Sequence, residues 1–109
     1  MRRIEFIVEK ITVGRRITSI IGRCAGDALR VDDIFDSIYE YDPARSLEDY
    51  ALPVARKNVQ EVSLSVCSIR AYRRDLVELS SGMTARVALS GSGAEKLKEG
   101  WVLSGCRDG

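Results

Sequence analysis

The residues best suited to bind an anionic partner lie in one short stretch of the second half of the chain. They are Arg70, Tyr72, Arg73 and Arg74. Arginine forms paired hydrogen bonds with carboxylate or phosphate, and a tyrosine ring can stack on an RNA base. The other interpretation is a solvated turn that Asp75 and Glu78 partly neutralise. The stretch therefore predicts either a binding corner for RNA or an acidic protein, or an ordinary charged turn.

A second candidate surface combines carboxylates with tyrosines. Residues 31–50 carry seven acidic side chains and one arginine, a net charge of −6. The residues of interest are Asp36, Tyr39, Glu40, Tyr41, Glu48, Asp49 and Tyr50. Aromatic and acidic side chains together could plug a basic protein surface, such as the active site of a nuclease. The alternative is a solvated loop whose tyrosines pack over one end of the fold.

Catalytic chemistry has little support. Histidine is absent, which excludes Ser-His-Asp and Cys-His catalysis and every histidine-ligated metal site. The sequence SGSG at 90–93 lacks the spacing of a nucleophile turn and has no base to activate a serine. Asp32, Asp33 and Asp36 could bind a hard cation, but their spacing is not that of an EF-hand. We therefore expect no enzymatic activity, no catalytic residues, no cofactor and no metal site.

Overall charge and cysteine content favour a cytoplasmic protein. The chain has 109 residues, with 17 basic and 16 acidic side chains, and a domain built to hold long duplex nucleic acid is usually far more basic. Cys24, Cys67 and Cys106 form no C-x-x-C pair, which predicts small apolar residues in a reduced protein. No apolar run has the length of a signal peptide core or a membrane span, so we expect no membrane partner.

The dominant hydrophobic period is two, which predicts β-strands. We expect them at 3–13, 16–24, 34–41, 59–69, 83–90 and 101–103, with at most one helical turn at 94–99. Residues 42–58 contain both prolines and no alternation, so they are predicted to be an irregular insertion. The prediction is one domain over 1–109, with insertion loop 42–58 and a short polar tail at 104–109. Many short strands in so short a chain favour a sandwich or a small closed barrel.

The order of turns and strands resembles the second domain of elongation factor Tu and related translational GTPases. The first matching stretch is FIVEK at 6–10, GRRI at 14–17, IGR at 21–23, AG at 25–26, LRV at 29–31 and Asp33. The second is VCSI at 66–69, YRR at 72–74, Gly82, VALSG at 87–91 and Glu95, and it ends in Leu97-x-x-Gly100-x-Val102-Leu103. Asp32 stands where that family usually has glycine, and aspartate tolerates a left-handed turn.

This resemblance implies an all-β fold, a small closed six-stranded Greek-key barrel, without the GTPase domain. The chain has no Gly-x-x-x-x-Gly-Lys-[Ser/Thr] loop, so no nucleoside triphosphate is expected to bind. In elongation factor Tu the barrel helps hold the aminoacylated end of transfer RNA, partly through an acid and an amide. Those positions fall on Arg70 and Thr84 here, and only Arg73 matches a basic residue of that surface. Aminoacyl-RNA binding is therefore not carried over.

Taken together, the residues and the resemblance predict a non-catalytic module that binds a macromolecule, with protein favoured over RNA. The first hypothesis is a translation-associated adaptor that contacts its partner through residues 70–74. The alternative is an inhibitor or immunity-type protein that blocks a basic toxin or nuclease through the acidic, tyrosine-bearing segment.

Overall fold

The computed structural model describes residues 2–40 and 57–107. The strands are β1 (Arg2–Val13), β2 (Thr18–Cys24), β3 (Leu29–Arg30), β4 (Ile34–Glu40), β5 (Lys57–Ala71), β6 (Arg74–Leu76), β7 (Glu78–Leu79), β8 (Thr84–Ser92) and β9 (Trp101–Arg107). A single 3₁₀ turn, η1 (Ala94–Lys96), precedes β9 and corresponds to the helical turn expected near 94–99. The part of the chain described here contains no helix long and apolar enough to cross a membrane.

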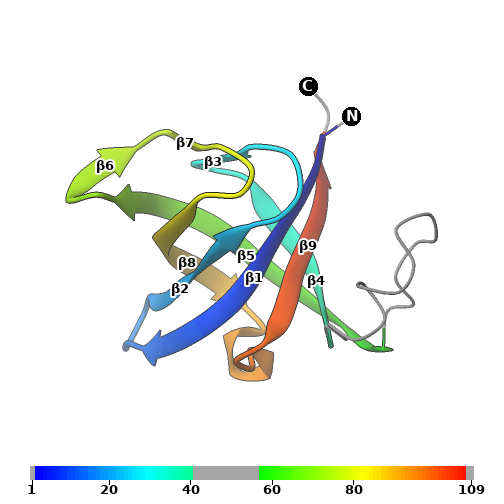
Figure 1. The fold of residues 1–109 in the computed structure, drawn as a ribbon. Coiled ribbons are helices and arrows are strands. Elements are labelled where there is room, and N and C mark those ends of the chain that lie inside the picture. Colours follow the sequence, from blue (N-terminus) through cyan, green and yellow to red (C-terminus); the bar gives the residue numbers. More distant parts are fainter. Residues whose placement is uncertain (1, 41–56, 108–109) are drawn as a thin grey trace.

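Six strands close into an antiparallel barrel (Figure 1). Their order is β4-β9-β1-β2-β8-β5, and β4 pairs with β5 to complete the circle. Closure gives each of these strands a partner on both sides, so their backbone groups are satisfied within the sheet. Strand β6 continues the sheet beyond β5, and β3 pairs with β7 in a separate small ribbon. The predicted all-β fold with a closed six-stranded barrel is confirmed.

Side chains along β5 alternate between the core and the outer surface, and this alternation shifts by one residue part-way along the strand. Val62, Leu64 and Val66 are buried, whereas Ser63 and Cys67 on the opposite face are exposed. A register shift between Val66 and Ser68 in the pairing with β8 marks a β-bulge. One extra residue reverses which face each later side chain occupies, so Ile69 and Ala71 are buried and Arg70 is exposed. The bulge is therefore what places Arg70 on the outer surface.

The last strand is longer than the sequence suggests, and the predicted polar tail at 104–109 is wrong over most of its length. Strand β9 extends to Arg107, and Ser104 and Gly105 are buried between β1 and β4. Gly105 is needed there because a Cβ would lie 2.5 Å from the carbonyl oxygen of Ile34. Small polar residues suit a strand between two close neighbours, so their polarity was a misleading signal.

The predicted insertion, residues 42–58, overlaps the start of β5, because Lys57 and Asn58 belong to that strand. The rest of it lies outside the described residues. The predicted turn at Asp32 is confirmed by its left-handed backbone, with a φ of 75°.

Candidate functional site

Five residues make up what we call the arginine corner: Arg70, Tyr72, Arg73, Arg74 and Arg86. Arg70 on β5 stands directly opposite Arg86 on β8, and both side chains are exposed on the outer face of the barrel. Tyr72 and Arg73 form the turn that leads into β6. A groove of about 440 Å³ lies between these elements, and its lining includes Arg70, Tyr72, Arg73, Thr84 and Arg86. Arg74 is exposed on β6 and does not line the groove, so the other four residues of the corner form a concave, basic surface with one exposed ring.

The turn in the corner has an unfavourable backbone. Ala71 pairs with Arg74, so Tyr72 and Arg73 are the two central residues of a tight hairpin, with φ of 52° and 62°. Such a turn favours Asn-Gly, because side chains with a Cβ cost on the order of 1 kcal/mol each in the left-handed region. Tyr72 is 81% exposed, so burial of its ring does not offset this cost. Strain at an exposed aromatic and an arginine makes this turn a candidate binding element.

The acidic neighbours of the corner form no ion pair with its arginines within the described part of the chain. Glu78, which was a candidate for that role, accepts a hydrogen bond from Arg30 Nε at 2.7 Å. Asp75 stands opposite Arg70 in the β5–β6 pairing without forming an ion pair. Within residues 2–40 and 57–107, no arginine of the corner has an ion-pair partner. Of the two acids in the solvated-turn interpretation, Glu78 is engaged by Arg30, whereas Asp75 stands opposite Arg70 beyond ion-pair distance.

Arg86 was not among the residues singled out in the sequence. Its neighbours Ala85 and Val87 are buried, so the alternation of β8 alone places Arg86 on the outer face. What the alternation does not show is that β8 lies beside β5 in a register that brings Arg86 opposite Arg70. The pairing of distant strands, rather than a local motif, completes the corner.

The acidic candidate surface is only partly described, and the described residues do not form one surface. Asp36 is exposed on β4. Tyr39 belongs to the barrel strand β4 rather than to a loop, is 5% exposed, and donates from its hydroxyl to Glu5 Oε2 at 2.7 Å. Glu40 accepts a hydrogen bond from Asn58 Nδ2 at 2.7 Å. The other predicted members, Tyr41, Glu48, Asp49 and Tyr50, lie outside the described residues.

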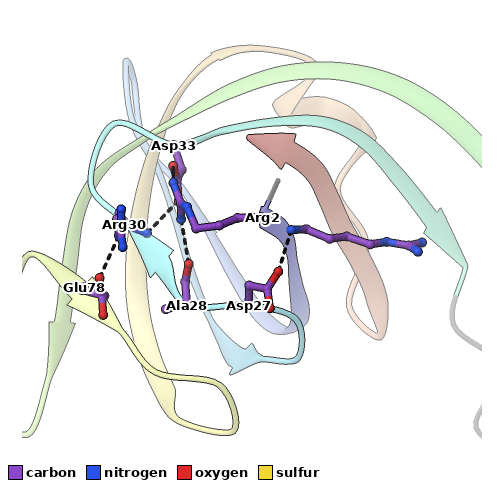
Figure 2. Close-up of polar contacts among 7 residues, drawn as sticks. Arg2, Asp27, Ala28, Arg30, Asp33 and Glu78 are labelled. Atoms are coloured by element: carbon purple, nitrogen blue, oxygen red, sulfur yellow. Dashed lines mark hydrogen bonds and ion pairs between the residues drawn. The ribbon is translucent and has the colours of Figure 1, made fainter. Parts of the chain in front are cut away.

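A second charged cluster, centred on Arg2 and Asp33, lies where the start of β1 meets the turn before β4 (Figure 2). The Arg2 guanidinium donates to both carboxylate oxygens of Asp33, at 2.8 and 3.1 Å, and to the carbonyl of Ala28 at 2.9 Å. The main-chain N–H of Arg30 donates to Asp33 as well, at 2.8 Å. The hydrogen bond from Arg2 to Asp33 raises the pKa of the arginine. We call the Arg2–Asp33 pair the clamp, because it joins the start of β1 to the turn before β4.

The clamp also bears on the cation considered for Asp32, Asp33 and Asp36. The carboxylate of Asp33 is already engaged by an arginine and a main-chain N–H, which leaves it poorly placed to act as a ligand. Among the residues that the structure describes, no group of three histidine, cysteine, aspartate or glutamate side chains is arranged to hold a metal ion.

The cysteines differ in their surroundings. Cys24 is buried, and desolvation raises the pKa of its thiol, as expected for a small core residue. Cys67 and Cys106 are exposed, and all three cysteines are free thiols. Alternation along β5 places Cys67 on the outer face, where its thiol donates to Ser90 Oγ at 3.1 Å.

Comparisons with known proteins agree with the geometry. No family model matches the chain, and a search of the curated proteins finds no match. Two solved structures of translation elongation factor SelB from Methanococcus maripaludis do match, one in the apo form and one in complex with the GTP analogue GppNHp. Both superpose with a TM-score of 0.65 at 16% sequence identity and cover 94% and 95% of this chain. The fold is that of a translation-factor barrel.

This likeness concerns one part of a much longer protein. The barrel spans 18% and 19% of the two elongation-factor chains. At this level of identity the superposition establishes the fold of the translation-factor barrel, and the side chains of the corner have to be interpreted on their own chemistry.

Proposed function

We propose that this translation-factor-like barrel is a non-catalytic, translation-associated adaptor that holds an acidic region of a partner protein at the arginine corner. One observation carries the proposal. Arg70, Arg73 and Arg86 approach the same groove from β5, the β5–β6 turn and β8, and none of them has an ion pair within the described part of the chain. Arginines held close together repel one another, and carboxylates of a partner would relieve that repulsion with paired hydrogen bonds.

The composition of the corner favours protein over RNA. Tyr72 in the corner is 81% exposed, and Val77, which follows β6, is 82% exposed. Tyrosine and arginine are the side chains most enriched at the energetic centre of protein interfaces. Asp75 lies on β6 next to Arg74, and its carboxylate would repel an RNA phosphate. A surface of mixed sign with exposed apolar groups therefore suits a protein better than a nucleic-acid backbone.

The translation association is supported by the fold alone. SelB is a translation elongation factor, and this chain has the fold of one of its parts. With no phosphate-binding loop in the sequence, we expect the barrel to act by occupying a surface rather than by hydrolysing GTP.

The test is an affinity capture with the full chain as bait in native lysate, with and without nuclease, followed by mass spectrometry. The informative variant is R70A/R73A/R86A, and its matched control is R15A/R16A, which removes two exposed arginines from the β1–β2 hairpin. We expect one acidic translation protein to be retained by the wild type and the control in both lysates, and to be lost from the triple variant. Retention by the triple variant contradicts the proposal, and loss on nuclease treatment assigns the corner to RNA.

The inhibitor alternative stays a prediction. Of its seven proposed contact residues, the structure describes three, and Tyr39 is buried rather than presented to a partner. No described contact favours a basic toxin or nuclease as the partner.

A further inference from the structure

We infer that the open edge of β6 accepts an extended segment of the partner protein as an added strand, acidic at one end and apolar at the other. The inference rests on the proposed function, because Arg73 and Arg74 of the arginine corner, which lie at the turn end of β6, provide the contact for the acidic end. Main-chain hydrogen bonds with the edge would hold the segment, and the side chains along β6 would select it.

Strand β6 is the place where the barrel sheet stays open. Each of the six barrel strands has a neighbour on both sides, whereas β6 is paired with β5 and has no second neighbour among the described strands. In Figure 1 the β5–β6 hairpin projects beyond the barrel wall. An unpaired edge presents main-chain donors and acceptors to whatever approaches it.

The register identifies which residue of the edge is available. Antiparallel pairs alternate between hydrogen-bonded and non-hydrogen-bonded, and the pair that flanks a two-residue turn, here Ala71 and Arg74, is hydrogen-bonded. Arg70 and Asp75 are therefore a non-hydrogen-bonded pair, and the N–H and C=O of Asp75 point away from β5. No residue in the described ranges bonds to them. One residue of an added strand can exchange two hydrogen bonds with Asp75.

The side chains along this edge change from basic to apolar. Arg73 and Arg74 lie at the turn end, and Leu76 and Val77 lie at the other end. An acidic residue of the partner would stand opposite Arg74 and an apolar residue opposite Leu76. Strand β6 is three residues long, about 10 Å, and Arg73 and Val77 flank it, so a segment of about five residues spans the edge. An uncharged β-forming residue such as threonine suits the position opposite Asp75.

Asp75 also disfavours a second copy of this chain as the occupant. In a symmetric antiparallel pairing of two β6 strands centred on this residue, the two Asp75 carboxylates would stand opposite each other, and like charges in that position are destabilising. The edge therefore favours a different protein over self-association.

The experiment measures binding of the full chain to two fluorescent peptides blocked at both ends, with sequences Val-Val-Thr-Glu-Glu and Glu-Glu-Thr-Val-Val. These fit the edge in antiparallel and parallel directions. The decisive variant is D75P, which removes the outward N–H without touching a β5–β6 hydrogen bond. Its matched control is D75A, which removes the charge and keeps the N–H. We expect the wild type and D75A to bind within about threefold of each other and D75P to bind at least about tenfold more weakly.

The outcomes separate this inference from the proposed function. Equal binding by D75P and D75A overturns strand addition, while loss of binding in R70A/R73A/R86A would still support the corner. Failure of the wild type to bind either peptide overturns the inference. If the wild type instead binds an eight-nucleotide oligouridylate, the ligand is assigned as RNA. Equal binding by the wild type and the triple arginine variant overturns the proposed function itself.

A second measurement keeps the inference testable should D75P fold poorly. Hydrogen exchange of the Asp75 amide in the wild type should slow at least about tenfold when the bound peptide is saturating, because the amide then donates to the added strand. An unchanged exchange rate at saturation overturns the inference.

Discussion

The clamp and the arginine corner use the same side chain in opposite ways. The Arg2 side chain is 17% exposed, and both of its terminal nitrogens donate to an Asp33 side chain that is 4% exposed. The arginines of the corner are exposed and have no ion-pair partner among the described residues. In the clamp, two opposite charges are buried together. In the corner, several like charges remain exposed to solvent.

The difference follows from what the barrel places opposite each arginine. Arg2 begins β1 beside the turn that contains Asp33, whereas the cross-strand neighbour of Arg70 on β8 is another arginine. Removing one partner of a buried ion pair leaves the other charge buried and unpaired, which costs about 3–5 kcal/mol of stability. An ion pair between exposed side chains contributes about 0–1 kcal/mol. We therefore assign the clamp to stability, and the exposed corner is the surface for which we propose binding.

The largest expected effect comes from breaking the clamp. Asp33→Ala should lower the free energy of unfolding by about 3 kcal/mol, because Arg2 loses its counter-charge and the Arg30 N–H loses its acceptor. Urea denaturation at neutral pH measures the loss. Asp36→Ala, at an exposed position of β4, is the control and should change stability by less than about 0.5 kcal/mol. Equal stability of the Asp33→Ala and Asp36→Ala variants would contradict a stabilising role for the Arg2–Asp33 pair.

A smaller effect of opposite sign should come from the strained turn. Replacing Tyr72 by Asn together with Arg73 by Gly should raise the free energy of unfolding by about 1 kcal/mol, because Asn-Gly accepts the left-handed backbone. The same variant should bind the partner less well, since two side chains of the corner are gone. The matched control is Y72A/R73A, which removes both side chains and keeps the strain, so it should bind weakly without becoming more stable. A gain in stability for both variants would contradict the strain argument.

The smallest effect sharpens the comparison directly. Arg86→Ala should leave the free energy of unfolding within about 0.5 kcal/mol of the wild type. At low ionic strength Arg86→Ala should be slightly more stable than the wild type, because the repulsion between Arg86 and Arg70 is removed. Added salt should abolish this difference in stability. Thermal unfolding at two salt concentrations measures both. A loss above about 1 kcal/mol would mean that Arg86 has a structural partner.

Much of the barrel could be predicted because its signals are local. The alternation at Val62, Leu64 and Val66, and again at Ala85, Val87 and Leu89, identifies buried faces without knowledge of any partner strand. The left-handed position of Asp32 follows from its place in a turn. Arg70, Tyr72, Arg73 and Arg74 were found for the same reason, because they are neighbours along the chain.

Other features depend on which strands meet and in what register. The β5 bulge turns Arg70 outward, the β5–β8 pairing adds Arg86 to the corner, and the position of β9 between two strands makes Ser104 a buried residue. The packing of Tyr39 against the barrel follows from contact with a residue 34 positions away. Period-two alternation is a property of adjacent residues and is visible in the sequence. Register and bulges arise between segments far apart in the chain, so they are known once the barrel has closed.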